Sequence, residues 1–158
     1  MDQATPATRE QIERLRDVFD TCFGCGATNK VGLGLSTFTA TDNGATGPFS
    51  VGDDYTGFHG VVHGGVIATA LDEISAWAAI LSEGVFVLTA KLDIRYRREA
   101  RPRVAYTLTG DVSLRQGKRL SIESELTAPE GVIAQSSGLF IVAGSVVSVL
   151  ADHDARHV

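Results

Sequence analysis

The stretch GVVHGGVIATALDEISAWAAILSEG, residues 60–84, decides how this chain folds. Residues 66–81 are apolar almost all the way round, which predicts one long helix that ends before Gly84. A helix of this length spans about 24 Å. Two adjacent acids, Asp72 and Glu73, interrupt the apolar segment, although burying a carboxylate costs several kcal/mol unless a partner satisfies it. The segment therefore predicts a buried helix that carries a carboxylate with a function.

Shorter elements flank this helix. Thr8 and Gln11 have the spacing of a capping box, and apolar residues at helical spacing then predict an amphipathic helix over residues 9–20. An Asn-Gly pair at residues 43–44 is a hairpin signal. Period-two patterns predict strands over residues 33–40, from the hairpin to about 51, and over 85–98, 104–114, 120–127 and 132–144. The last four are expected to form an antiparallel meander.

A helix that is apolar all round needs to be wrapped rather than covered on one side. The predicted fold is therefore α+β, with a curved antiparallel sheet of about six strands wrapped around one long central helix. Such a sheet leaves an exposed edge, which favours self-association. In the strand over 85–98, alternation predicts two faces. One face carries Leu88, Ala90, Leu92, Ile94 and Tyr96, and the other carries Thr89, Lys91, Asp93, Arg95 and Arg97.

Charge is distributed unevenly along the chain. The net charge of the 158 residues is −5, yet residues 91–119 hold nine of the 14 Lys and Arg and only three of the 19 acids. This basic block is either a site for an anionic partner or a solvated strand face, and charge alone does not separate the two. The nearly apolar run over 139–151 is too short to cross a bilayer and suits a buried strand. With no secretory signal at the start, we expect a cytoplasmic protein that binds neither nucleic acid nor membrane.

His63-Gly64-Gly65 precedes the long helix. The first N–H groups of a helix have no partner within it and carry the positive end of the helix dipole, so this terminus can hold an anion or a carbonyl oxygen that becomes one. Asp72 lies seven residues beyond Gly65, about 10 Å further along the axis. One carbonyl cannot contact both groups of the same helix. If both are catalytic, two chains must supply them, and the protein works as a dimer.

HGGVIATALDE, with its acid nine residues after the histidine, resembles the phenylacetate-type (PaaI-like) branch of the hotdog-fold acyl-CoA thioesterases. CFGCGATNKVGLGL, YTGFHGVVHGG and LTAKLDIRYRREA occur in the same order and at similar spacing in that branch. The resemblance covers roughly residues 22–142. It implies a hotdog domain over 22–145, a helical extension over 1–21 and a tail over 146–158, of which we expect the last eight residues to be unstructured. It also implies hydrolysis of an acyl-CoA thioester to a free acid and coenzyme A by a homodimer, with dimers pairing into tetramers.

The resemblance also implies roles for individual residues. The Gly65 N–H polarises the thioester carbonyl, with Gly64 beside it, and His63 fixes the loop and touches the substrate. Asp72 of the partner subunit is the general base or the nucleophile, with both roles open. Thr69 and Thr89 are expected near the carboxylate or its water, and Lys91, Arg97 and Arg98 at the coenzyme A phosphates. Apart from the resemblance, Phe58 and Glu73 are candidate substrate contacts, with a role for Glu73 as a loop or interface partner as the alternative. Some members carry an Asn six residues before the histidine, where this chain has Gly57.

Two other readings of the same residues remain. A non-enzymatic acyl-CoA sensor usually carries a DNA-binding domain, for which the 21 residues before Cys22 are too few. A hotdog dehydratase would need a His on the helix approach, and the Gly-Gly context of His63 fits thioesterases better. Cys22 and Cys25 form a CxxC, but a structural zinc needs four ligands and the chain has no second Cys pair. We therefore expect no metal and no cofactor beyond the coenzyme A of the substrate.

Overall fold

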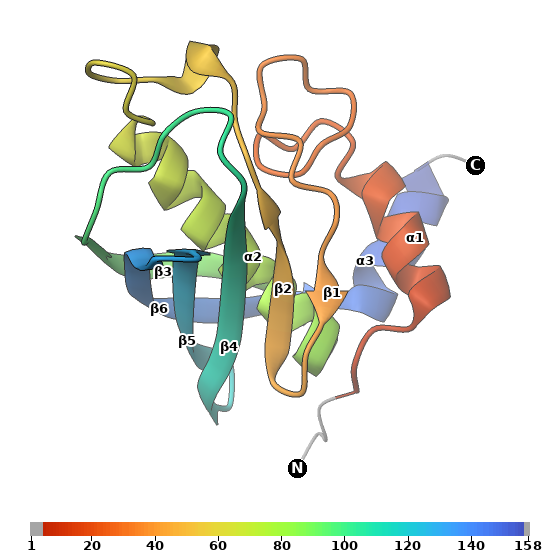
Figure 1. Cartoon of the computed structure of the whole chain (residues 1–158). Coiled ribbons are helices and arrows are strands. Elements are labelled where there is room, and N and C mark those ends of the chain that lie inside the picture. The colour runs from red at the N-terminus through yellow and green to blue at the C-terminus, as the bar shows by residue number, and fades with distance from the viewer. Residues whose placement is uncertain (1–4, 157–158) are drawn as a thin grey trace.

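The computed structural model describes residues 5–156. A six-stranded antiparallel sheet curves around helix α2 (Gly64–Glu83), as Figure 1 shows. The strands are β1 (Thr39–Ala40), β2 (Gly44–Phe49), β3 (Val85–Tyr96), β4 (Tyr106–Gln116), β5 (Arg119–Ala128) and β6 (Gly131–Ser145). Their order across the sheet is β1-β2-β4-β5-β6-β3. The predicted α+β architecture, with six strands around one central helix, is confirmed.

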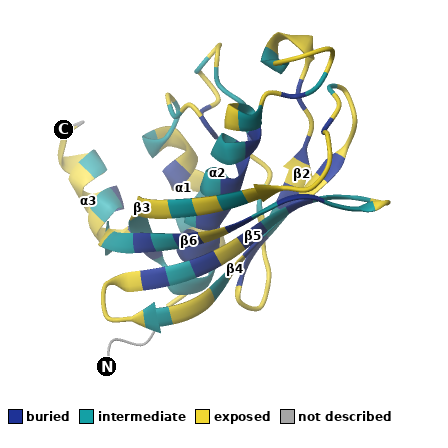
Figure 2. Cartoon of the chain, turned by 90° about the vertical axis from the view of Figure 1, so that its left-hand side faces the viewer, coloured by how far each residue is buried: buried dark blue, intermediate teal, exposed yellow. Residues whose placement is uncertain are grey.

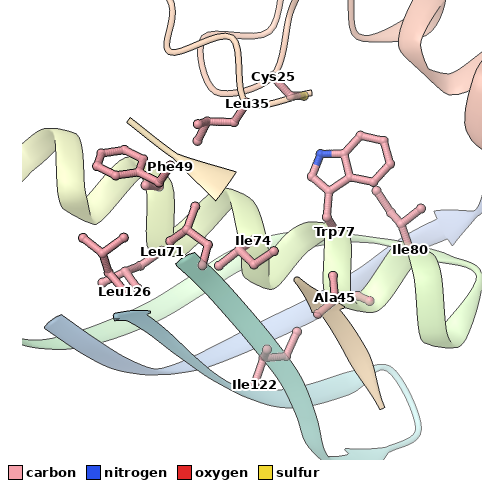
Figure 3. Packing of buried hydrophobic residues seen from close by; sticks show 14 of the residues in the cluster. Cys25, Leu35, Ala45, Phe49, Leu71, Ile74, Trp77, Ile80, Ile122 and Leu126 are labelled. Carbon is pink, nitrogen blue, oxygen red and sulfur yellow. The ribbon is translucent and has the colours of Figure 1, made fainter. Parts of the chain in front are cut away.

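Helix α2 lies in the concave face of the sheet. It begins at Gly64, with His63 as its N-cap, and Gly84 ends it in the left-handed conformation with φ 62°. Although α2 is long and apolar enough to span a bilayer by composition alone, more than half of it is buried within the fold. Side chains from α2 and from the facing strands form the core, and Figure 3 shows Leu71 and Ile74 of the helix among them. The predicted core helix and its end are confirmed.

Strand β3 does not continue into a meander as expected. Only β4, β5 and β6 form one, whereas β3 pairs with β6 from Val85 to Tyr96. Short turns join β4 to β5 and β5 to β6, and β2 covers the other side of β4. The free side of β6 is therefore the position left for β3, and residues 97–105 carry the chain back to β4. In consequence β3 is a long edge strand, visible along one side of the sheet in Figure 2.

A β-bulge in β3 corrects the predicted faces of this strand. Thr89 pairs with Phe140 and Lys91 with Leu139, so Ala90 is an extra residue in the ladder. One extra residue moves every following side chain to the other face. Phe140 is fully buried against the helix, and Thr89 therefore faces α2. The prediction that Thr89 shares a face with Lys91 was wrong.

The N-terminal region agrees with the sequence in part. Helix α1 (Arg9–Val18) has the predicted capping box, in which the Gln11 N–H donates to Thr8 Oγ1 at 3.3 Å and the Thr8 N–H to Gln11 Oε1 at 2.9 Å. The strand expected over 33–40 is formed only at β1. Before β1, the backbone N–H groups of Leu33 and Leu35 donate to the carbonyls of Phe23 and Gly24. These residues thus bind the CxxC loop instead of the sheet.

Residues 146–156 form a helix, which corrects the expected unstructured tail as far as Arg156, and residues 157–158 of that prediction lie outside the described residues. Helix α3 (Val146–Arg156) packs against α1, and Leu150 is buried. The apolar run over 139–151 is therefore strand only as far as Ser145. The physical reason is a serine cap, because the Ser148 N–H donates to Ser145 Oγ at 3.1 Å and the Ser145 N–H to Ser148 Oγ at 3.0 Å.

Candidate active site

Asp72 and Thr89 form the centre of the candidate site. Asp72 is half-buried on α2, and Thr89 Oγ1 donates a hydrogen bond of 2.6 Å to Asp72 Oδ1 from strand β3. The bulge at Ala90 turns the Thr89 side chain toward the helix. A short hydrogen bond to an ionised acceptor is strong and fixes the direction of the carboxylate. Thr89, which was predicted to lie near the attacking group, thus contacts Asp72.

The start of α2 is the second part of the site. The Gly65 N–H donates to His63 Nδ1 at 2.9 Å, so the N-cap is the imidazole itself. A nitrogen that accepts an N–H bond carries no proton, and the remaining proton of a neutral His63 is therefore on Nε2. His63 and Gly65 are both exposed. The helix start thus presents an imidazole N–H donor and one backbone N–H whose present partner is an exposed side chain.

Gly57 and Phe58 of the preceding loop line a hollow together with His63. A Cβ at Gly57 would lie 3.2 Å from His63 Cδ2, so the position where some thioesterases carry an Asn lies directly against this imidazole. Phe58 is 75% exposed, and its ring packs on that of His59 with centroids 4.1 Å apart. His59 has φ 43°, a left-handed conformation that a residue with a Cβ adopts rarely. The loop before the helix is therefore constrained, and it holds an exposed aromatic ring beside the site.

A groove of about 390 Å³ runs from the start of α2 along the end of β3. Gly64, Tyr96, Arg97 and Arg98 contribute to its walls. The Tyr96 hydroxyl donates to the Gly64 carbonyl at 2.8 Å and ties the end of β3 to the first turn of the helix. The sequence alone gave Tyr96 no role in this site. The alternation of residues in β3, which places Tyr96 on the same face as Ile94, could have predicted that Tyr96 reaches the helix. Two of the predicted phosphate contacts, Arg97 and Arg98, are thus next to the helix start.

The third predicted phosphate contact, Lys91, lies apart from this groove. It follows the bulge on the outer face of the sheet and pairs with Asp93 at 2.7 Å.

Thr69 also differs from expectation. Its hydroxyl donates to the Gly65 carbonyl at 3.0 Å, one turn back along the helix, and not to the Asp72 carboxylate. A threonine inside a helix commonly makes this bond because the carbonyl of residue i−4 is within reach.

Glu73 points away from Asp72, as its position about 100° further around the helix requires. Glu73 Oε1 accepts a hydrogen bond of 3.0 Å from Trp77 Nε1, and Cys22 Sγ lies 3.8 Å from Oε2. Burial raises the pKa of Glu73, and burial together with the Glu73 charge raises the pKa of Cys25. Glu73, predicted as a substrate contact or as a loop partner, thus lies in a second cluster on the other side of α2, against the CxxC loop.

The comparisons with known proteins agree with this arrangement. The sequence model of the thioesterase superfamily matches residues 59–134, which include the helix start, Asp72 and Thr89. No curated protein matches the sequence. The match and the fold confirm the predicted resemblance to hotdog-fold thioesterases of the PaaI type. Both support a thioester hydrolase.

Solved structures share this fold. A hypothetical thioesterase from Streptococcus pneumoniae TIGR4, solved with coenzyme A, superimposes with a TM-score of 0.64 at 21% identity, over 69% of this chain and 86% of that one. A Streptococcus mutans UA159 protein bound to acetyl-CoA gives 0.63 and 21%, over 68% and 88%. The PaaI protein of the Escherichia coli phenylacetic acid degradation operon gives 0.61 and 20%, over 66% and 80%.

Proposed function

We propose that this protein hydrolyses an acyl-CoA thioester to a free acid and coenzyme A. The observation that carries the proposal is the 2.6 Å hydrogen bond from Thr89 to Asp72, which fixes a half-buried carboxylate beside an edge strand. The arginines of the groove at the helix start supply partners for phosphate. The streptococcal neighbours that were solved with coenzyme A and acetyl-CoA support this class of ligand.

The thioester carbonyl binds at the start of α2. There the Gly65 N–H exchanges its bond to His63 Nδ1 for one to the carbonyl oxygen, at little cost because a neutral hydrogen bond is worth only about 0.5–1.5 kcal/mol net. The released imidazole donates its remaining N–H to the same oxygen. Both donors and the helix dipole stabilise the negative charge that develops on this oxygen.

Asp72 supplies the proton transfer. Its carboxylate removes a proton from water, the water oxygen bonds to the carbonyl carbon, and the carbonyl electrons move to the oxygen held at Gly65. When these electrons return, the carbon–sulfur bond breaks, and the proton on Asp72 passes to the leaving thiolate of coenzyme A. Direct attack by Asp72 would instead form an anhydride that water then opens. Single turnover in ¹⁸O-water separates the two: general-base attack places ¹⁸O in the released acid, whereas direct attack followed by opening of the anhydride at the aspartyl carbonyl places ¹⁸O in Asp72 and releases an acid that carries only ¹⁶O.

Two chains are required to assemble this centre. Asp72 lies about 10 Å along the helix axis from Gly65 of the same chain, too far for one carbonyl to contact both. Strand β3 is a 12-residue edge with unpaired backbone groups, and Leu88 on it is 67% exposed. A second copy that pairs with β3 would complete the sheet and bring Asp72 to the partner's helix start.

Replacement of Asp72 tests the enzyme directly. Asp72→Asn keeps the shape of the side chain and the bond from Thr89 but removes the base, and we expect hydrolysis of acyl-CoA to fall by at least about 100-fold. The assay is free-thiol release from a panel of short, long and aromatic acyl-CoAs. Asp93→Asn on the outer face of β3 is the matched control and retains wild-type rates. Near-wild-type turnover by Asp72→Asn would reject the mechanism.

Complementation tests the shared site. We expect two inactive variants, Asp72→Asn and Gly65→Pro, which lacks the N–H donor, to regain about a quarter of wild-type activity when refolded together. Random pairing makes about half of the dimers mixed, and each mixed dimer has one intact site of two. A mixture that stays inactive while mixed dimers form would show that one chain holds the whole site. The cytoplasmic location, the pairing of dimers and the absence of nucleic-acid and membrane partners remain predictions.

A further inference from the structure

Two cysteines and a carboxylate that the proposed mechanism does not use meet on the other side of α2. Cys22 and Cys25 lie on the loop after α1, and Glu73 comes from the middle of the core helix. Their ligand atoms, two Sγ and one carboxylate oxygen, all lie within 4.8 Å of one another. Cys25 is buried and the other two are half-buried. Figure 3 shows Cys25 on the loop facing the side of α2 from which Trp77 projects.

The loop is shaped so that the sulfurs reach the carboxylate. The Gly26 N–H donates to the Cys22 carbonyl at 2.9 Å and closes a tight turn around the CxxC. A Cβ at Gly24, between the two cysteines, would overlap Glu73 Oε2, so only glycine permits this approach. Leu33 and Leu35 hold the loop from its other side through their backbone N–H groups. The thiols are therefore fixed against Glu73 by several independent contacts.

The carboxylate is held in one orientation. Trp77 Nε1, one turn further along α2, donates to Glu73 Oε1 at 3.0 Å and leaves Oε2 directed toward the cysteines. Carboxylates that bind metals are generally fixed in this way by a hydrogen bond to their second oxygen. The arrangement thus presents two sulfurs and one oriented oxygen toward a common point.

The surroundings provide no positive charge for these three acidic groups. The cluster forms one end of a cavity of about 150 Å³, whose other walls are apolar or aromatic. These walls are formed by Phe19, Ala76, Trp77, Ile80, Phe86 and Val87. No Lys, Arg or His of residues 5–156 contributes to them. A half-buried carboxylate with only weak thiol donors and one indole N–H beside it is costly, and a cation would reduce that cost.

We propose that Cys22, Cys25 and Glu73 bind one zinc ion, with the fourth position of the tetrahedron open to the cavity. Two thiolates select zinc over calcium or magnesium, which prefer all-oxygen ligands. Neighbouring ligands in a tetrahedral zinc–sulfur site are roughly 3.8 Å apart, so the side chains need to close by about 1 Å at most. Both thiols release their protons to solvent on binding. The ion would join the CxxC loop to the core helix beside Asp72, and this inference does not rest on the thioesterase proposal.

Cobalt substitution tests the site in the full, tag-free chain. The protein is freed of metal with a chelator under a non-thiol reductant and then titrated with Co²⁺. We expect one Co²⁺ per chain, with thiolate-to-cobalt absorption in the near ultraviolet and the visible bands of a tetrahedral ion, both abolished by one equivalent of Zn²⁺. Absence of the thiolate band in the folded wild-type protein would overturn the proposal, whether or not any variant folds.

Variants identify the ligands. We expect the Cys22→Ser/Cys25→Ser double variant to lose stoichiometric zinc by elemental analysis. Trp77→Phe, which removes only the bond to Glu73, should weaken zinc binding by about 10- to 100-fold. Asp72→Asn is the matched control on the neighbouring position of the helix and should bind zinc like the wild type, even though it does not hydrolyse thioester. Zinc that remains bound in the double cysteine variant would assign it to other residues and refute the site.

Discussion

Removing the hydroxyl of Thr89 separates the orientation of Asp72 from its chemistry. Thr89→Val keeps the β-branched shape that suits strand β3 but deletes the 2.6 Å hydrogen bond to Asp72 Oδ1. The carboxylate remains, so the general base is present but no longer held in one direction. We expect kcat to fall with little change in KM, because the bond orients a reacting group and does not bind the coenzyme.

The size of the effect follows from the strength of the bond. A hydrogen bond to an ionised group contributes about 1.5–3 kcal/mol. Because Thr89 is exposed and Asp72 only half-buried, solvent screening favours the lower end of that range. The lower end, about 1.5 kcal/mol, corresponds to a fall in kcat of about tenfold, because each factor of ten in rate corresponds to about 1.4 kcal/mol. Initial rates of thiol release over a range of acyl-CoA concentrations measure kcat and KM separately.

Two further variants control this experiment. Thr89→Ser retains the hydroxyl and should keep most of the activity, whereas Thr107→Val makes the same change at an exposed site on β4, separated from β3 by two strands. Urea unfolding should show all three variants folded. Full activity in Thr89→Val, or an equal loss in Thr89→Ser, would refute the view that this hydrogen bond positions the catalytic carboxylate.

Two other predictions concern stability. Burial raises the folded-state pKa of Glu73 above its ordinary value of 4.5. In metal-free protein, the stability that the Glu73 carboxyl contributes is therefore fully present below pH 4.5 and is lost as the pH rises through the raised pKa. Urea unfolding should therefore find metal-free Glu73→Gln more stable than the wild type at about pH 8 but not at about pH 4, and equal differences at both would contradict the burial argument. Gly84→Ala should lower the free energy of unfolding by at least about 1–2 kcal/mol, because φ 62° strains any residue with a Cβ and the added Cβ would also overlap the Thr5 carbonyl oxygen. Gly52→Ala, at φ −81° with open space around it, is its control and should be near neutral.

The central features of the fold could be predicted from the sequence because they depend on local patterns. The apolar segment over 66–81 has no polar face, so it had to be surrounded by other elements, and Gly84 is the residue that ends such a helix. The His63-Gly64-Gly65 start and Asp72 lie on one element, and the helical rise sets their separation. These features require no knowledge of which distant residues meet.

The second cluster shows what local patterns could not provide. The CxxC offered two sulfur ligands, and the sequence has no second Cys pair to complete a zinc site. Glu73 is separated from Cys22 by 51 positions, and its approach depends on the loop being bound by Leu33 and Leu35. That segment had been predicted as a strand. Since its N–H groups bind the CxxC loop instead of the sheet, the same backbone bonds that contradict the strand also create the cluster.

The bulge at Ala90 links the fold to the site in a similar way. In a regular strand Thr89 would share the outer face with Lys91, and the Asp72 carboxylate would lose its partner. One extra residue lets Thr89 face the helix while Leu92 and Ile94, further along the strand, also pack inward. A pattern of alternating residues cannot reveal the bulge, because the residues before and after it are compatible with a regular strand as well as with a bulged one. The irregularity of β3 is therefore what allows one edge strand to hold the Asp72 carboxylate and also to cover the core.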